Sequence, residues 1–241
     1  MKTLAFRFLN SPEDIREAAM NTVRKEAEGE FSPTLFYRYL ISEHSPIRGL
    51  TLRVVFGDML GYTSVHFARH VHSIPYVSSN RPDRTGKARS VEDTVNHMMD
   101  VNCQALIDMA RKRLCRQCSP DTLGWMHELQ SALLLCPPER AHAEFYRALG
   151  RSLAPNCVYR AGCPEFKPFG FWSAFRNKYG ANFDETIQSR YDAYVLQEHL
   201  TGAVEELREY LNSLPPMNAT MRAQDVILNS LELNKELNAK K

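Results

Sequence analysis

The stretch "ARHVHSIPYVSSNRPDR", residues 68–84, gathers three arginines, two histidines and three serines in a chain of otherwise ordinary composition. A phosphate group is bound well by charge-assisted hydrogen bonds from arginine, by hydroxyl groups and by free backbone N–H groups. The run Ser78-Ser79-Asn80-Arg81 offers all three kinds of donor on a segment that we expect to be irregular. The stretch therefore indicates an anion site, although a solvated loop after a helix can have the same composition.

The composition of the whole chain limits what such a site can bind. Its 241 residues, 44% of them hydrophobic, can bury a sizeable core in one large domain or two small ones. Because 30 Lys and Arg residues stand against 28 Asp and Glu residues, the formal net charge is only +2. This balance argues against binding a nucleic acid polymer or a membrane through a broad basic field. Any anion site must therefore be local.

The first 20 residues lack the apolar core of a signal peptide, because Arg7 interrupts their one apolar run. No window of the sequence approaches the roughly 18 apolar residues that a membrane-spanning helix needs. We therefore expect a cytoplasmic protein. Its six cysteines would remain reduced there, as thiols or as metal ligands.

Local signals predict a mostly helical α+β chain. Helix starts and an apolar spacing of three to four residues predict helices over 13–23, 33–41, 90–113, 121–135, 138–149, 184–212 and 222–238, with a short helix ending near Arg69. Apolar residues alternate in "RGLTLRVVFGDML", residues 48–60, which predicts a strand. Residues 154–172 are rich in Pro, Gly, Cys and aromatic residues and show no period.

Order and spacing make the opening stretch specific. Arg69 and His70 are followed by Val71, by seven further residues and then by Ser79. This pattern resembles the R-H-R-x7-S motif of the flavin-dependent thymidylate synthases.

Two flanking segments extend the resemblance to about residues 32–125. Upstream, Glu43-His44 precedes a strand and the lead-in "SVHFARH", as in that family. Downstream, "VNCQALIDMARKR", residues 101–113, is similar to the family's V-N-A-R-S-L helix that ends in an arginine.

The resemblance implies a reaction at C5 of the uracil ring of dUMP. In that family reduced FAD takes a one-carbon unit from methylenetetrahydrofolate and delivers it to dUMP, and NADPH restores the reduced flavin. The resemblance also implies a mostly helical α+β subunit with a small antiparallel sheet, in a homotetramer whose sites lie where subunits meet. Residues 1–153 would form the flavin- and nucleotide-binding domain, and residues 154–241 would pack on that domain.

Site residues follow from the same resemblance, position by position. It assigns four residues to FAD: His44, Arg69, His70 and Asn102. It assigns four residues to dUMP: His66, Ser79, Arg81 and Arg113. Ser79 and Arg81 would hold the nucleotide phosphate, and the catalytic roles would fall to Ser79 and Arg113. A permanently charged planar guanidinium suits the polarisation of a uracil carbonyl.

The chain departs from the family pattern at several positions. Val71 replaces the second arginine of the motif, and Val77 stands where an acidic residue is usual. Gln104 and Asp108 stand where the family has Arg and Asn. These departures leave two alternatives open. One is a flavin enzyme that installs another one-carbon group on a pyrimidine nucleotide, and the other is a non-catalytic nucleotide- or partner-binding module of the same fold.

Four cysteines form a second candidate site. Cys115 and Cys118 make a C-x2-C pair, and Cys157 and Cys163 lie in the irregular segment further along the chain. Four thiolates from two short segments are a permitted ligand set for a structural zinc ion. The alternative is that these residues are ordinary buried thiols.

Overall fold

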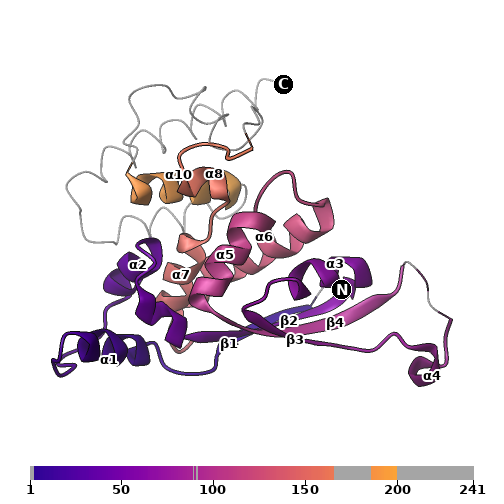
Figure 1. Cartoon of the computed structure of the whole chain (residues 1–241), viewed down its shortest axis with the longest axis horizontal. Helices are drawn as coiled ribbons and strands as arrows, with labels where there is room; N and C mark the ends of the chain where they lie inside the picture. The colour runs from indigo at the N-terminus through magenta and orange to yellow at the C-terminus, as the bar shows by residue number, and fades with distance from the viewer. Residues whose placement is uncertain (1–2, 89, 91, 166–185, 200–241) are drawn as a thin grey trace.

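The computed structural model describes residues 3–88, 90, 92–165 and 186–199 (Figure 1). Its strands form one antiparallel sheet in the order β1-β2-β4-β3. The strands are β1 (Thr3–Phe8), β2 (Thr51–Leu60), β3 (Ser73–Val77) and β4 (Thr94–Asn102). The helices are α1 (Glu13–Thr22), α2 (Pro33–Ile41), the 3-10 helix η1 (Ser45–Gly49), α3 (Gly61–Ala68), α4 (Pro82–Thr85), α5 (Cys103–Arg113), α6 (Pro120–Leu134), α7 (Ala143–Ser152), α8 (Asn156–Tyr159) and α10 (Ile187–His199). The predicted α+β class with a small antiparallel sheet is confirmed.

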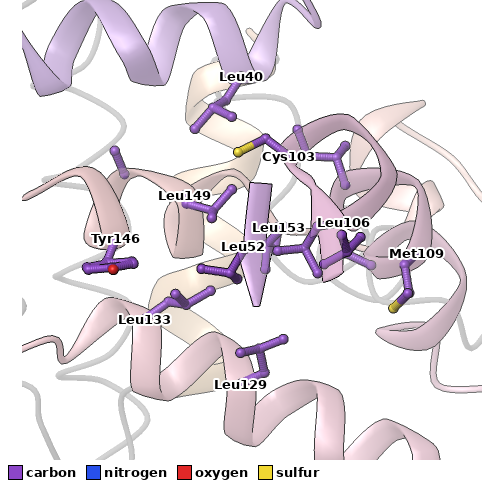
Figure 2. Packing of buried hydrophobic residues seen from close by; sticks show 14 of the residues in the cluster. Leu40, Leu52, Cys103, Leu106, Met109, Leu129, Leu133, Tyr146, Leu149 and Leu153 are labelled. Carbon is purple, nitrogen blue, oxygen red and sulfur yellow. The ribbon is translucent and has the colours of Figure 1, made fainter. Parts of the chain in front are cut away.

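One side of the sheet carries the core. Alternate residues of β2 are buried, beginning with Leu52 and Val54, because successive side chains of a strand point to opposite faces. Helices α5, α6 and α7 gather on that side of the sheet (Figure 1). In Figure 2, Leu106, Leu133 and Leu149 come from these three helices and surround Leu52. Each such side chain contributes about 1.5–3 kcal/mol to stability on burial.

Predicted helix starts are confirmed at both N-terminal helices. The Ser32 hydroxyl accepts a hydrogen bond from the backbone N–H of Leu35 at 3.1 Å, which caps α2, and Pro33 occupies the first turn. The buried face of α2 is formed by Phe36, Tyr37 and Leu40, whereas Leu35 is 36% exposed.

The predicted helix over 90–113 is wrong in its first half, where the chain forms strand β4 and only then helix α5. Val95, His97, Met99 and Val101 are buried in alternation and pair with the central strand β2. Pairing with β2 therefore outweighed the helical spacing, which some of the same residues also satisfy. Strand β3, which the sequence did not predict, occupies the sheet edge beside β4.

The later helices follow the prediction more closely. Helix α6 matches the predicted 121–135, whereas α7 begins at Ala143 rather than 138. Arg151 of α7 and Asp192 of α10 form a buried two-bond ion pair at 2.5 and 2.7 Å. The predicted helix over 222–238 and the aromatic residues of 166–175 lie outside the described residues. No helix among the described residues is long and apolar enough to cross a membrane.

Candidate functional site

Three predicted site residues meet where α3 ends against the last turn of α5. Arg113 is the last residue of α5, and its Nε donates a hydrogen bond to Nε2 of His70 at 2.9 Å. Its Nη2 donates to the backbone carbonyl of His66 at 2.7 Å. His66 lies on α3 and His70 follows that helix directly. The structure thus brings together residues from two of the three motifs, although they are 43 positions apart in the sequence.

The histidines of this cluster are electrically neutral. Burial first, and the charge of Arg113 second, lower the pKa of His70 to about 4. Because the Nε2 of His70 accepts a hydrogen bond, its proton sits on Nδ1. The pKa of His66 is lowered by burial and then by Arg113 and Arg69. The cluster therefore holds the Arg113 guanidinium between the neutral imidazole of His70 and the backbone carbonyl of His66.

Two side chains that the sequence did not single out support His66. Its Nδ1 lies 2.8 Å from Oγ1 of Thr122 and 3.4 Å from Oγ of Ser119. These two hydroxyl groups are themselves 2.7 Å apart and come from the start of α6. Only the tertiary contact between α3 and α6 reveals this role, because the sequence shows no more than a Ser-Pro helix start.

A pocket of about 260 Å³ opens at the start of α5. Its lining residues are Arg48, His72, Asn102, Gln104, Ala105 and Asp108. Asn102, predicted as a FAD contact, caps α5, since its Oδ1 accepts a hydrogen bond from the backbone N–H of Ala105 at 2.9 Å. His72 belongs to the same short connection as His70, just before β3 begins at Ser73. The pocket and the Arg113 cluster are therefore linked by the α3–β3 connection and by α5.

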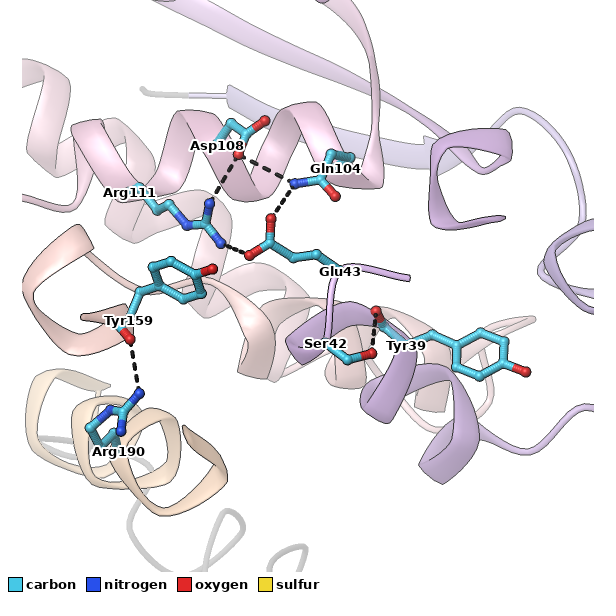
Figure 3. Close-up of polar contacts among 8 residues, drawn as sticks. All are labelled: Tyr39, Ser42, Glu43, Gln104, Asp108, Arg111, Tyr159 and Arg190. Carbon is cyan, nitrogen blue, oxygen red and sulfur yellow. Dashed lines mark hydrogen bonds and ion pairs between the residues drawn. The ribbon is translucent and has the colours of Figure 1, made fainter. Parts of the chain in front are cut away.

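One wall of this pocket is held by a half-buried carboxylate, that of Glu43 (Figure 3). Its Oε2 accepts a hydrogen bond from Nε2 of Gln104 at 2.7 Å, and its Oε1 pairs with Arg111. The guanidinium of Arg111 also lies 3.8 Å above the ring of Tyr159 and bonds Asp108 at 3.2 Å. Glu43 adopts φ of 53°, a left-handed conformation that costs a non-glycine residue about 1–2 kcal/mol. The contacts of Glu43 with α5 are therefore made in spite of an unfavourable backbone conformation.

The Glu43 carboxyl is ionised. Burial raises its pKa, but hydrogen bonds from Arg111 and Gln104 and the charge of Arg111 outweigh that effect, so the pKa lies below the usual value. The sequence offered Glu43 only as part of the Glu43-His44 pair. Arg111 belonged to an ordinary basic helix end, so the ion pair was not predicted.

The remaining predicted FAD contacts are exposed. The His44 side chain lies at the start of η1, with its ring 4.8 Å from that of Tyr39. Arg69 is the exposed residue at the end of α3. Among the described residues, neither side chain forms a hydrogen bond or an ion pair with His70, Asn102 or Arg113.

The predicted phosphate residues lie apart from this cluster. Strand β3 begins three residues after His70, and Ser79 lies beyond its other end, so about 20 Å of extended chain separates Ser79 from Ser73. The Ser79 hydroxyl accepts a hydrogen bond from the backbone N–H of Arg81 at 3.3 Å. Arg81 forms an exposed ion pair with Asp83 at 2.6 Å. One copy of the chain therefore does not bring Ser79 and Arg81 to Arg113.

The four cysteines of the predicted zinc site line one pocket of about 230 Å³ at the end of α5. Cys115 and Cys118 form a tight turn closed by a backbone hydrogen bond of 2.8 Å, and Cys157 and Cys163 face them from the α8 region. Within the described residues, no three His, Cys, Asp or Glu side chains are grouped closely enough to hold a metal ion. Zinc binding by these cysteines stays a prediction.

No family model and no curated protein matches the chain. A solved structure titled as a UMP/dUMP methylase, PolB from Streptomyces cacaoi, bound with 5-Br dUMP, is similar with a TM-score of 0.47 and 13% sequence identity. The match covers 64% of this chain and 98% of that one. A likeness this distant assigns neither a family nor an activity to the chain.

Proposed function

We propose that the chain is a FAD-dependent thymidylate synthase, which methylates dUMP reductively at C5 with methylenetetrahydrofolate and NADPH. The observation that carries the proposal is the contact of Arg113 with both His70 and His66. Two motifs that resemble the family at separate places in the sequence meet in space at the residues that the resemblance assigns to dUMP and FAD.

The pocket at the start of α5 fits one edge of a flavin. It combines a guanidinium, an imidazole, two side-chain amides and a carboxylate, which together can donate to and accept from a polar heterocycle. In the proposed enzyme, Asn102 and His70 hold the flavin from the two ends of this region. Bound reduced FAD would supply the electrons and the one-carbon transfer. Arg113 would orient the uracil and stabilise negative charge on its carbonyl oxygen.

The proposal requires Ser79 and Arg81 to act on the site of another subunit, as in the predicted homotetramer. The exposed Arg81–Asp83 pair is worth at most about 1 kcal/mol, so a nucleotide phosphate can replace the carboxylate. The sheet also offers a face turned away from the helices. On it, Val55, Met98 and Tyr76 stand in one cross-strand row, with Tyr76 exposed. Light scattering after size-exclusion chromatography tests the assembly.

One observation favours the alternatives. Val71, which replaces the second arginine of the motif, is 89% exposed and contributes no charge to the site. A chain without that arginine could transfer another one-carbon group, or it could bind a nucleotide without flavin. Mass analysis of the nucleotide product separates the first alternative from dUMP methylation, and the absence of flavin binding identifies the second.

The first experiment is the visible absorption spectrum of the purified protein, before and after addition of FAD and then of dUMP. A flavin spectrum that shifts on addition of dUMP supports the proposal, because stacking of the nucleotide perturbs the flavin bands. Arg113→Ala should weaken dUMP binding by about 2–4 kcal/mol, the scale for a charged contact removed from water. Lys25→Ala, in the exposed loop after α1, is the matched control. A protein that binds neither FAD nor dUMP would refute the proposal.

A further inference from the structure

The Gln104 side chain is fixed in one orientation by its neighbours (Figure 3). Its Nε2 donates one hydrogen bond to Oε2 of Glu43 at 2.7 Å and one to Oδ1 of Asp108 at 3.3 Å. An ionised carboxylate only accepts hydrogen bonds, so a flipped amide would set its oxygen against two carboxylates. Both protons of the amide are therefore used on this side. No residue in the described part of the chain donates to the carbonyl oxygen Oε1, which is the free end of Gln104.

The carboxylates themselves are held in place. Glu43 is ionised and paired with Arg111, and the same guanidinium bonds Asp108 at 3.2 Å. Arg111 in turn lies against the ring of Tyr159. The acceptor on Gln104 is thus presented by a chain of contacts that runs from α8 through α5 to the loop before η1, and it needs little reorganisation to bind a ligand.

Two donor side chains share the pocket with this acceptor, and the Asp108 carboxylate, which already accepts from Gln104 and Arg111, lines it too. Gln104 lines the pocket of about 260 Å³ together with Arg48 and His72. The Arg48 guanidinium can only donate hydrogen bonds, and the His72 imidazole offers at least one N–H. The pocket thus combines a fixed acceptor with donors on other elements. A heterocycle with an N–H between two carbonyl groups has the complementary pattern.

We propose that this pocket binds the imide edge of a heterocycle, with Gln104 Oε1 accepting the hydrogen bond from the N3–H group. Arg48 and His72 donate to the flanking carbonyl oxygens O2 and O4. Uracil and the isoalloxazine ring of flavins share this imide, so the ligand is either dUMP or FAD. The inference rests on the proposed function and adds to it the residue that selects the imide.

The test compares ligands that differ only at N3. Isothermal titration calorimetry measures the affinity of the protein for FAD and N3-methyl-FAD, and separately for dUMP and N3-methyl-dUMP. For the ligand that occupies the pocket, N3 methylation should weaken binding at least tenfold, since it removes one hydrogen bond and leaves an acceptor unpaired. We call the factor by which N3 methylation weakens binding the N3 ratio. In Gln104→Met, whose side chain is similar in size but has no carbonyl, the N3 ratio of that ligand should fall severalfold. The other ligand should show the same ratio in both proteins.

A second variant makes the test independent of the folding of Gln104→Met. Arg48 is exposed, so Arg48→Met should fold normally. This variant should lower the affinity for the parent ligand and for its N3-methyl form by the same factor, because the contact from Arg48 to a carbonyl oxygen is common to both. Unchanged affinity for both ligands in Arg48→Met would place the imide elsewhere.

The outcomes separate this inference from the proposed function. If FAD and dUMP both bind but neither N3 ratio depends on Gln104, the inference is overturned and the proposed function stands. If neither ligand binds the unaltered protein, both are overturned. A Gln104-dependent ratio for FAD alone assigns the pocket to the flavin, and one for dUMP alone assigns it to the uracil.

Discussion

Replacing Arg113 by methionine tests the cluster where α3 meets α5. The change removes the hydrogen bonds to His70 Nε2 at 2.9 Å and to the His66 carbonyl at 2.7 Å. A hydrogen bond from a charged group contributes about 1.5–3 kcal/mol, and water replaces part of each bond in this half-buried place. We therefore expect the free energy of unfolding to fall by about 2–4 kcal/mol. Urea denaturation followed by circular dichroism measures it.

The same substitution should change the titration of His70. Burial is the main cause of its low pKa of about 4, and the charge of Arg113 is the second. Arg113→Met should therefore raise the pKa of His70, though not to the usual value of about 6.5, because burial remains. Arg113→Lys keeps the positive charge but not the planar pair of donors, so it should lower stability while leaving this pKa low.

Nuclear magnetic resonance of the imidazole protons gives the pKa of His70 in both variants. An unchanged pKa in Arg113→Met would refute the charge effect. Equal pKa values in the methionine and lysine variants, both raised, would show that the hydrogen bond rather than the charge controls the imidazole.

Three further changes test the fold. The side chains of Arg151 and Asp192 are only 4% and 2% exposed. Arg151→Met leaves the Asp192 carboxylate buried without this partner, so the free energy of unfolding in chemical denaturation should fall by about 3–5 kcal/mol. Burial lowers the pKa of His97 to about 4, so below about pH 6.5 the unfolded chain takes up a proton that the folded chain does not. Stability should therefore fall as the pH decreases from about 6.5 to about 4, by on the order of 3 kcal/mol from this residue, and His97→Phe should remove that share of the loss in urea titrations at several pH values. Gly150→Ala would place a Cβ 3.0 Å from the backbone nitrogen of Leu134, where α7 packs on α6, and should lower the unfolding free energy by about 1–3 kcal/mol in thermal melts. Full stability of Arg151→Met or Gly150→Ala would contradict the packing described, and an unchanged pH dependence in His97→Phe would contradict the assignment to His97.

Local sequence signals predicted those elements that have a recognisable helix start or a clear alternation of apolar residues. The predicted starts of the helices at 13 and 33 and the alternation in β2 correspond to observed elements. Residues 94–102 were misassigned because Val95, Met98, Met99 and Asn102 also fit a helical spacing, and only pairing with β2 decides between the two periods. Long-range pairing of this kind leaves no mark in a short window of sequence.

The site shows the same division. The resemblance to the family's spaced motifs selected His70 and Arg113, which meet in the structure. It could not show that Ser79 is carried away along β3, because that strand was not predicted. Nor could it find the role of Glu43 and Arg111, since a charged pair 68 residues apart is recognisable only after the chain has folded.

The edge position of β3 bears on how the chain avoids association with other chains. An edge strand leaves backbone groups open to pairing with any passing extended chain, and this one also exposes Ile74 and Tyr76. Pro75, between them, has no N–H group to donate. A strand that added to this edge would lack one hydrogen bond in the middle of its ladder. Replacing Pro75 by a β-branched residue would restore that donor and turn this edge into a starting point for fibrils.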